Sequence, residues 1–166
     1  MVMILRISNA SSIALLCVLC LSSYANAIVT IISDSITYNK EGTSLRATGN
    51  VTVEYGDYKL STPELVYNKE LKLLIAKEPI ELTNKDKLKV MSDFAKISDD
   101  FREIIALHAR ALIDKRFYLN SKKMQRFKSG HSIFYSSVGT TCKVCSSSPV
   151  PTWQIKSERI LHNQKA

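Results

Sequence analysis

Two cysteines, Cys142 and Cys145, have the residue type and spacing that point most directly to chemistry. A C-x-x-C pair can form a disulfide, bind a metal ion or exchange disulfides with another protein. Adding His131 and His162 does not give the ligand spacing of the known zinc fingers. The pair also lies among Gly, Thr, Ser and Pro residues that are typical of a loop, and not in the βαβ setting of a thioredoxin-type redox site. A disulfide is the interpretation we favour, and we expect no metal ion and no cofactor.

No other group of residues has the spacing of a catalytic site. The histidines His108, His131 and His162 have no paired carboxylate or serine motif near them in the sequence. The sequence contains no H-E-x-x-H, no G-x-S-x-G and no Gly-rich phosphate loop. We therefore predict that the chain is not an enzyme.

The first residues have the pattern of a secretory signal peptide. Arg6 is followed by an uncharged apolar run at residues 13–21 and by Ala25-Asn26-Ala27, an A-x-A cleavage sequence. We predict cleavage after Ala27. The alternative, a retained anchor, is disfavoured because a membrane-spanning helix needs about 20 apolar residues. Secretion would place the two cysteines in an oxidising compartment, where disulfides persist.

The charge of the chain indicates an anionic partner. With 23 Lys and Arg against 15 Asp and Glu, the 166 residues carry a formal charge of +8, which favours phosphate, nucleic acid or lipid headgroups. Cations interleave with aromatic residues at residues 115–131, as in many nucleic-acid surfaces. Because a secreted chain does not meet nucleic acid, we interpret this segment as an exposed strand face or a surface for anionic lipid.

Apolar and polar residues alternate along most of the chain, which predicts antiparallel β-strands. Through residues 45–55 the apolar side chains share one parity and the polar side chains the other. Turns are predicted at residues 68–70, 78–79 and 84–86. Residues 104–113 fit either a strand or an amphipathic helix, and we favour the strand. The length suits one domain, and the pattern predicts an all-β fold of short strands.

An internal repeat of 29 residues runs through this region. It aligns residues 38–41 with residues 67–70, both reading Tyr-Asn-Lys-Glu, and it also aligns Ala47 with Ala76 and Val53 with Leu82. A weaker third copy begins at Asp93. Each copy would form two strands and two turns, which cannot bury their apolar side alone. Stacked copies predict two facing sheets with an apolar space between them.

Several segments resemble the OstA-like periplasmic domain of lipopolysaccharide transport proteins. They read D-S-I-T-Y-N at 34–39, A-T-G-N-V-T-V at 47–53, L-S-T-P-E-L-V-Y-N at 60–68 and A-K-E-P-I-E-L at 76–82. The segment C-K-V-C-S-S-S-P-V-P-T-W-Q-I-K at 142–156 is similar to the connector that precedes the barrel in the outer-membrane lipopolysaccharide-assembly (LptD) family. This second segment is the more specific of the two signals.

The resemblance implies three parts: a signal peptide at 1–27, an OstA-like β-jellyroll at 28–138 and a connector at 139–166. The jellyroll would be an open two-sheet stack of antiparallel strands with an apolar trough. Such a lining can hold acyl chains without directional contacts. We expect the trough to be lined by Ile36, Tyr38, Leu45, Ala47, Val51, Val53, Leu60, Leu65, Tyr67, Leu73, Ile75, Ile80, Leu82, Leu88, Val90 and Phe94.

By the same resemblance, the function would be lipopolysaccharide transport and assembly in the periplasm and at the outer membrane. The trough would receive the acyl chains of lipid A from an OstA-like bridge protein, joined by edge-strand addition, and pass them towards the barrel. An outer-membrane lipoprotein would be a partner only if a barrel were present. Nucleic acid is not an expected partner.

The sequence departs from the family in three ways. It stops where the barrel would begin, so we expect a fragment or the product of an interrupted gene. The C-terminal cysteines that pair with Cys142 and Cys145 in the family are absent, and Lys77-Glu78-Pro79 replaces the usual Gly-Asn turn. Two other interpretations stay open: a β-rich periplasmic scaffold or adaptor with a closed core, and a periplasmic enzyme or redox protein that uses the two cysteines.

Overall fold

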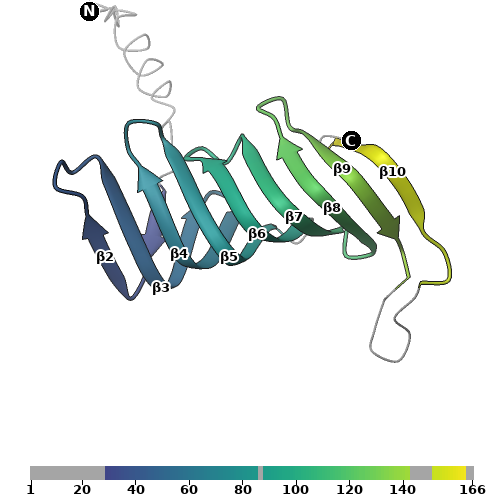
Figure 1. Ribbon diagram of the computed structural model, residues 1–166, viewed down its shortest axis with the longest axis horizontal. Coiled ribbons are helices and arrows are strands. Elements are labelled where there is room, and N and C mark those ends of the chain that lie inside the picture. Colours follow the sequence, from purple (N-terminus) through teal and green to yellow (C-terminus); the bar gives the residue numbers. More distant parts are fainter. Residues whose placement is uncertain (1–28, 86–87, 143–150, 164–166) are drawn as a thin grey trace, which may run out of the picture.

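The computed structural model describes residues 29–85, 88–142 and 151–163, which form one antiparallel sheet (Figure 1). Neighbouring strands pair in the order β1-β3-β4-β5-β6-β7-β8-β9-β10, and β2 also pairs with β3. The all-β prediction is confirmed. The strands are β1 (Thr30–Ile32), β2 (Ser35–Tyr38), β3 (Ser44–Tyr55), β4 (Tyr58–Asn68), β5 (Leu73–Asn84), β6 (Leu88–Ser98), β7 (Ile104–Ile113), β8 (Phe117–Arg126), β9 (His131–Thr140) and β10 (Ile155–Asn163).

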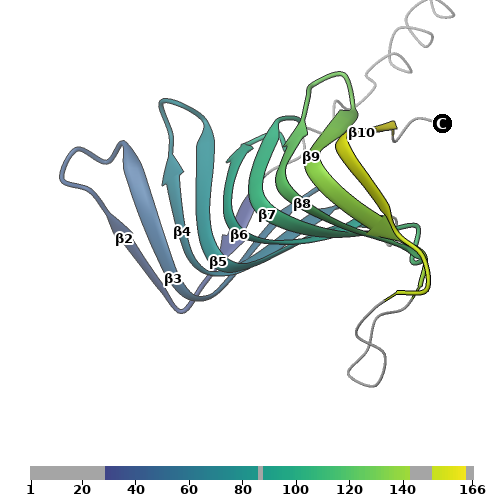
Figure 2. The same ribbon diagram turned by 45° about the vertical axis from the view of Figure 1, so that its right-hand side comes forward.

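Each long strand bends near its middle, so that the sheet folds over along a line that we call the crease (Figure 2). The register shifts at this line, between Ser61 and Glu64 in β4 and between Lys77 and Ile80 in β5. We call the half that contains β1 arm A and the half that contains β2 arm B. Arm A ends at the β3–β4, β5–β6 and β7–β8 turns, and arm B ends at the β4–β5, β6–β7 and β8–β9 turns.

At the crease, two or three successive residues of a strand turn away from the space between the arms. Thr62 and Leu65 are consequently both buried, although they lie three positions apart in β4. Hydroxyl groups line the inner side of the bend. The Thr62 Oγ1 donates to the carbonyl oxygen of Lys77 at 2.7 Å, and the Ser121 Oγ donates to that of Ala109 at 3.2 Å. These hydrogen bonds provide donors for buried carbonyl groups where the strands bend.

The crease brings together two of the segments that carry the family resemblance. The backbone N–H of Asp34 donates to the carbonyl oxygen of Gly49 at 2.9 Å, and Asp34 Oδ2 accepts a hydrogen bond from Asn50 Nδ2 at 2.9 Å. Gly49 has a φ of +75°, and a Cβ added there would lie 2.4 Å from Asp34 Oδ2. Only glycine fits this position. The two hydrogen bonds of Asp34 therefore hold the segment between β1 and β2 against the crease.

The strands are longer than the sequence pattern predicted, because the turn predicted at Glu78 and Pro79 is wrong. The peptide bond between Glu78 and Pro79 is cis and lies inside β5, at the crease. The turn predicted at residues 68–70 does separate two strands, and β5 ends at Asn84, where another turn was predicted. The two facing sheets are therefore the two arms of one sheet. Residues 104–113 form β7, which confirms the strand that we favoured.

The 29-residue repeat corresponds to successive hairpins of the sheet. Ala47 and Ala76, which the repeat aligns, both lie directly opposite Leu65. Val53 and Leu82 likewise both lie opposite Leu60. Equivalent positions of the repeat therefore occupy the same row across neighbouring strands.

The segment predicted to be a connector contributes to the sheet. β9 continues to Thr140, across the predicted boundary at residue 138, and β10 pairs with it, with Ile155 opposite Gly139. The predicted signal peptide with Ala27, and the cysteine Cys145, lie outside the described residues. In the described part of the chain, no helix has the length and apolar character needed to cross a membrane.

Candidate functional site

The space between the arms is lined by one face of the folded sheet, and this apolar interior is the candidate functional site. Residues directly opposite each other on antiparallel strands share a face, so lining residues can be followed from strand to strand. In arm A one row comprises Val53, Leu60, Leu82, Val90, Ala111 and Leu119. In arm B one row comprises Ala47, Leu65, Ala76, Ala95, Ala106, Met124 and Phe134. Every one of these residues is at most 4% exposed, so these two rows are shielded from solvent.

Most of the residues predicted to line a trough face this interior. Leu45 and Tyr67 are half-buried there. Ile36 and Tyr38, opposite Ala47 and Leu45, also face inward but remain 42% and 62% exposed because β2 is an edge strand. Contact with lipid stays a prediction for all of the residues predicted to line the trough. The predicted lining residues that are buried in the interior are Ala47, Val51, Val53, Leu60, Leu65, Ile80, Leu82, Leu88 and Val90.

For Leu73 and Ile75 the predicted facing was wrong. In β5 it is Leu74 and Ala76 that are fully buried, so the alternating residues Leu73 and Ile75 lie on the outer face. A turn at residues 78–79 would have let the parity change between Ile75 and Ile80. The strand instead continues through this point, and the inward positions on both sides of it are even-numbered.

Phe94 also lies on the outer face, contrary to the prediction. The inward positions in the first part of β6 are Leu88, Val90 and Ser92, all of them buried. The strand then bends at the crease, and the next inward residue is Ala95. A bend of this kind reverses the parity within a strand, which a regular alternation does not foresee.

Sequence reasoning missed the far wall of the interior, which β7, β8 and β9 supply. Its side chains were hard to recognise because many are small and because cations stand between them in the sequence. The fully buried Met124, for example, follows Lys122 and Lys123. The buried apolar residues of this wall are Ile104, Ala106, Ala109, Ala111, Ile113, Leu119, Met124 and Phe134.

An aromatic cluster closes the gap between the tips of the two arms, which we call the mouth. Phe101 lies in the β6–β7 turn at the tip of arm B, whereas Tyr55 and Tyr58 flank the β3–β4 turn at the tip of arm A. The Phe101 ring stacks on Tyr55 and Tyr58 with centroid distances of 5.7 Å and 5.5 Å. Phe101 is 0% exposed. Sequence reasoning did not single it out, because it is one apolar residue among charged neighbours.

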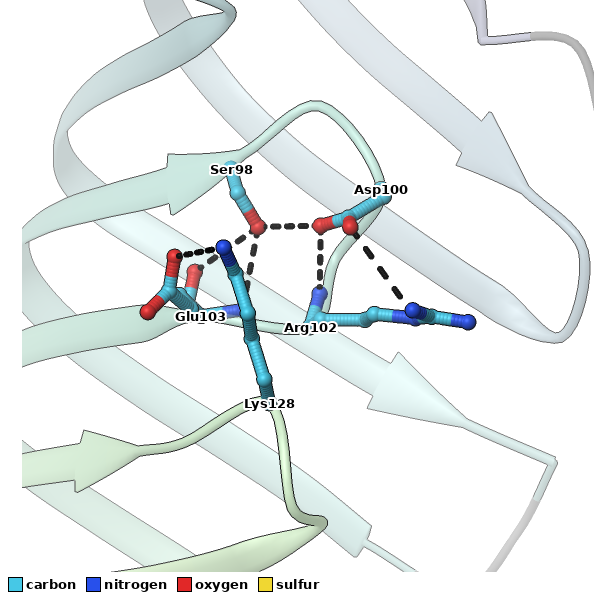
Figure 3. A network of polar contacts seen from close by, with 5 residues as sticks. All are labelled: Ser98, Asp100, Arg102, Glu103 and Lys128. Carbon is cyan, nitrogen blue, oxygen red and sulfur yellow. Dashed lines mark hydrogen bonds and ion pairs between the residues drawn. The ribbon is translucent and has the colours of Figure 1, made fainter.

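Polar contacts hold the β6–β7 turn that carries Phe101 (Figure 3). Ser98 Oγ donates to Asp100 Oδ1 at 2.5 Å and accepts the Glu103 backbone N–H at 2.9 Å. Asp100 Oδ1 also accepts the Arg102 backbone N–H at 3.0 Å. Lys128, from the β8–β9 turn, lies 3.5 Å from a Glu103 carboxylate oxygen and so connects two neighbouring turns of arm B.

These contacts keep Asp100 ionised. Partial burial raises the pKa of Asp100, but the hydrogen bonds from the Ser98 hydroxyl and the Arg102 N–H outweigh this effect and bring the pKa below 3.8. The network also supports a strained backbone, since Phe101 has a φ of +55°. Positive φ is rare for a bulky residue and persists only where its surroundings enforce it.

A second contact crosses the mouth beside the aromatic cluster. Arg126, at the end of β8 in arm B, lies with its guanidinium 5.3 Å from the centroid of the Tyr58 ring in arm A. His162, on β10, lies in the same row as Arg126. The pKa of His162 is lowered, and burial of the imidazole is the largest cause. The charge of Arg126 also lowers the pKa, whereas the charge of Asp114, at the tip of arm A, raises it. Charged groups of both arms therefore act on the same imidazole.

The structure gives His108 a carboxylate partner that the sequence did not reveal. His108 Nδ1 lies 3.0 Å from Asp93 Oδ2, on the outer side of the crease. Both side chains are exposed. Among the described residues, no hydroxyl or thiol is hydrogen-bonded to the His108 ring. The described residues also hold no cluster of three or more His, Cys, Asp or Glu side chains suited to a metal ion.

Cys142 lies just after β9, beside the start of the last strand. Its backbone N–H donates to Thr140 Oγ1 at 3.0 Å, and that hydroxyl donates to the carbonyl oxygen of Trp153 at 2.8 Å. Hydrogen bonding by Thr140, followed by the backbone of Trp153, lowers the pKa of the Cys142 thiol below 9.0. The pairing with Cys145 stays a prediction, because Cys145 lies outside the described residues.

Comparison with solved structures supports the fold. The chain is similar to the crystal structure of LptH from Pseudomonas aeruginosa, described as the LptA-homologous periplasmic component of the conserved lipopolysaccharide transport device. The TM-score is 0.52 at 13% sequence identity, over 60% of this chain and 75% of that chain. The prediction of an open, OstA-like antiparallel β-jellyroll is thereby confirmed.

Comparison of the sequence itself finds no relative: no protein-family model and no curated protein matches it. At 13% identity, the likeness to LptH concerns the fold alone. Membership of the LptD family, which the C-terminal segment suggested, therefore stays a prediction.

Proposed function

We propose that this chain carries lipopolysaccharide through the periplasm, with the acyl chains of the lipid held between the two arms. The observation that supports this most is the apolar interior of a folded sheet whose fold is similar to that of LptH. LptH is described as a periplasmic lipopolysaccharide transport component, and the signal peptide expected at residues 1–27 would bring this chain to the same compartment.

The chemistry of the interior suits acyl chains. Each methylene group moved from water into such an environment contributes about 0.8 kcal/mol. The buried polar side chains among the described residues all carry hydroxyl groups, which add no charge to the interior. They are Thr62, Ser92, Ser121, Ser132, Ser137 and Thr140. Away from Arg126 at the mouth, this largely apolar lining can accept several acyl chains and let them slide.

Acyl chains cannot enter through the mouth while it is closed. Phe101 fills the gap between the tips of the arms, and the lining residues Val53 and Leu60 are 0% exposed. Entry at the mouth therefore requires the tip of arm B to move away from Tyr55 and Tyr58. The contacts to be broken include two ring stacks and one cation–π contact, whereas the hydrogen-bonded ladder along the crease can stay intact.

The two ends of the sheet suit partners of the same fold. β1 and β2 lie at one end and β10 at the other, and each is an edge strand among the described residues. Inward-facing side chains stay exposed at both ends, namely Tyr38 at 62% and Ile155 at 54%. Addition of a partner's strand at either edge would cover these residues and extend the interior into the partner.

The proposal that the chain delivers lipid to an outer-membrane barrel rests on the C-terminal segment. The order Cys142, Trp153 and residues 154–156 resembles the connector of the LptD family, so the acceptor at the β10 end would be an outer-membrane barrel. The alternative is a scaffold or adaptor whose core stays closed. Full burial of the interior is the observation that favours this alternative.

Site-specific photo-cross-linking in cells that make lipopolysaccharide tests the proposal. A photoreactive residue in place of Val53 faces the interior, and one in place of Thr52, the matched control, faces the outer side of the same strand. We expect cross-links to lipopolysaccharide from position 53 and not from position 52. Absence of cross-links from position 53 in a folded protein would favour the closed scaffold.

A further inference from the structure

The outer face of arm B carries a second surface, distinct from the interior. Two rows of side chains cross β7, β8, β9 and β10 on this face, and we call them together the outer patch. The first row comprises Leu107, Lys123, Tyr135 and Arg159. The second row comprises Ile105, Gln125, Ile133 and Leu161. Leu107 is 38% exposed and Leu161 is 65% exposed, so the patch presents apolar side chains to solvent.

The cations at and beside the outer patch are not neutralised. Lys123 Nζ lies 5.4 Å from the centroid of the Tyr135 ring. Among the described residues, neither Lys123 nor Arg159 forms an ion pair, and neither do the adjacent exposed residues Lys122 and Lys156. No acidic residue belongs to either row of the patch.

On the outer face of β3, β4, β5 and β6, by contrast, cations form ion pairs with carboxylates. There Glu64 lies 3.6 Å from Arg46 and 3.9 Å from Lys77, and Lys89 lies 2.8 Å from Glu81. The difference extends to whole segments. Residues 104–142 and 151–163 hold nine Lys and Arg against two Asp and Glu, whereas residues 29–85 and 88–103 hold ten against twelve. The positive charge of the described chain is therefore concentrated at the β7–β10 end.

We propose that the outer patch docks the chain on a membrane surface that contains anionic phospholipids. Unpaired cations are attracted by the lipid phosphates. The exposed apolar side chains, with Tyr135 among them, can lie at the boundary between headgroups and acyl chains, where aromatic rings with a polar end are favoured. This surface lies on the opposite side of the sheet from the apolar interior, so the proposal does not depend on lipid transport.

Vesicle co-sedimentation tests this docking. The chain recovered from the periplasm is mixed with vesicles of phosphatidylcholine alone or of phosphatidylcholine with phosphatidylglycerol. We expect binding only to the second type, with weaker binding at high salt. Lys123→Gln with Arg159→Gln should reduce this binding by about tenfold or more. Leu161→Ser should weaken the binding that remains at high salt, where the apolar contribution dominates.

Lys59→Gln with Lys89→Gln is the matched control, because it removes the same charge from the outer face of arm A. These two residues form ion pairs with Glu54 and Glu81. We expect the control to bind vesicles within about twofold of the unaltered chain. Circular dichroism checks that each variant is folded. Equal losses in the two double variants, or no binding to anionic vesicles, would overturn the proposal.

The membrane-docking proposal and the lipopolysaccharide-transport proposal can be contradicted independently of each other. Loss of vesicle binding in the variant of Lys123 and Arg159 should leave the cross-link from position 53 in place, since neither side chain faces the interior. Absence of that cross-link would leave the expected vesicle binding unchanged.

Discussion

The ring of Phe101 lies almost parallel to the ring of Tyr55, with an interplanar angle of 6°, although the two residues belong to opposite arms of the sheet. Tyr55 pairs with Tyr58 across the β3–β4 turn, and Phe101 stacks on both. The contact closes the interior at a point where no backbone ladder connects the arms. Side chains of the described residues therefore hold the mouth shut.

Phe101→Leu should loosen the mouth without removing the apolar character of this position. Stacking of an aromatic pair contributes about 0.5–1.5 kcal/mol beyond area burial, so we expect a loss of about 1–3 kcal/mol in the free energy of unfolding. If acyl chains enter at the mouth, uptake of a fluorescently labelled fatty acid should become faster. Stopped-flow fluorescence and urea unfolding measure the two effects.

Phe134→Leu is the control for this experiment. Phe134 is also 0% exposed, but it lies in the wall of arm B and not at the mouth. We expect it to lose stability without faster uptake. Equal acceleration by both substitutions would show that general loosening of the core, and not the contact with Tyr55 and Tyr58, controls entry.

Leu73 and Leu74 give a direct test of which face of β5 is buried. Leu74 is 0% exposed, so Leu74→Ala should cost about 2–5 kcal/mol in the free energy of unfolding. Leu73→Ala removes the same atoms from the half-buried outer face and should cost about 1 kcal/mol or less. Urea unfolding compares the two variants. A larger cost at Leu73 would reverse the facing of this strand.

How much of the interior the sequence predicts depends on how regular each strand is. Val53 and Leu60 were placed correctly because each lies in a stretch of unbroken alternation. Leu73 was misplaced because a turn was predicted at residues 78–79, where β5 in fact continues with the same parity. Phe94 was misplaced because β6 changes parity at the crease, and local alternation does not show where such a bend falls. Phe101 could not be identified, since the two rings that stack on it belong to residues more than 40 positions earlier in the chain.

Asp100 should make the closed mouth sensitive to acid. Because the pKa of Asp100 is lowered from 3.8 in the folded chain, its ionised form stabilises the fold above pH 3.8, and this contribution is lost as the pH falls through the folded pKa. Asp100→Asn should therefore cost about 1 kcal/mol at neutral pH and little at about pH 3. Unfolding in urea at several pH values measures the difference.

Glu70→Gln, which changes an exposed carboxylate in the β4–β5 turn, is the matched control for Asp100→Asn. It should alter stability little at either pH. A constant cost of Asp100→Asn across this range would show that the hydrogen bonds to Ser98 and Arg102 do not depend on the charge of the carboxylate.

Thr140 should control the reactivity of Cys142 once any disulfide is reduced. Hydrogen bonding by Thr140 is the largest cause of the lowered pKa of this thiol. In a Cys145→Ser background, Thr140→Val should move the midpoint of the pH profile for alkylation of Cys142 upward, because it removes the hydroxyl whose hydrogen bonding lowers the pKa of this thiol. Thr140→Ser, which keeps the hydroxyl, should restore the lower midpoint. Identical profiles for the Val and Ser variants would contradict this role.

Cleavage of the signal peptide can be tested on the chain recovered from the periplasm. Amino-terminal sequencing should begin at Ile28, because small residues occupy both positions required before the cut. Sequencing that begins at Met1 would show that the first segment is retained. The same preparation, with the signal removed, should contain Cys142 and Cys145 as a reducible disulfide or as mixed disulfides.

The passage of each long strand through both arms links the two walls of the interior. A hairpin added to the sheet would lengthen arm A and arm B together, since each of its strands would contribute to both. Neighbouring strands lie about 4.8 Å apart, so duplication of one such unit would extend the enclosed space by about 10 Å. The strands at the two ends would be unchanged. Gene duplication alone could therefore lengthen the enclosed space of such a chain without a new fold.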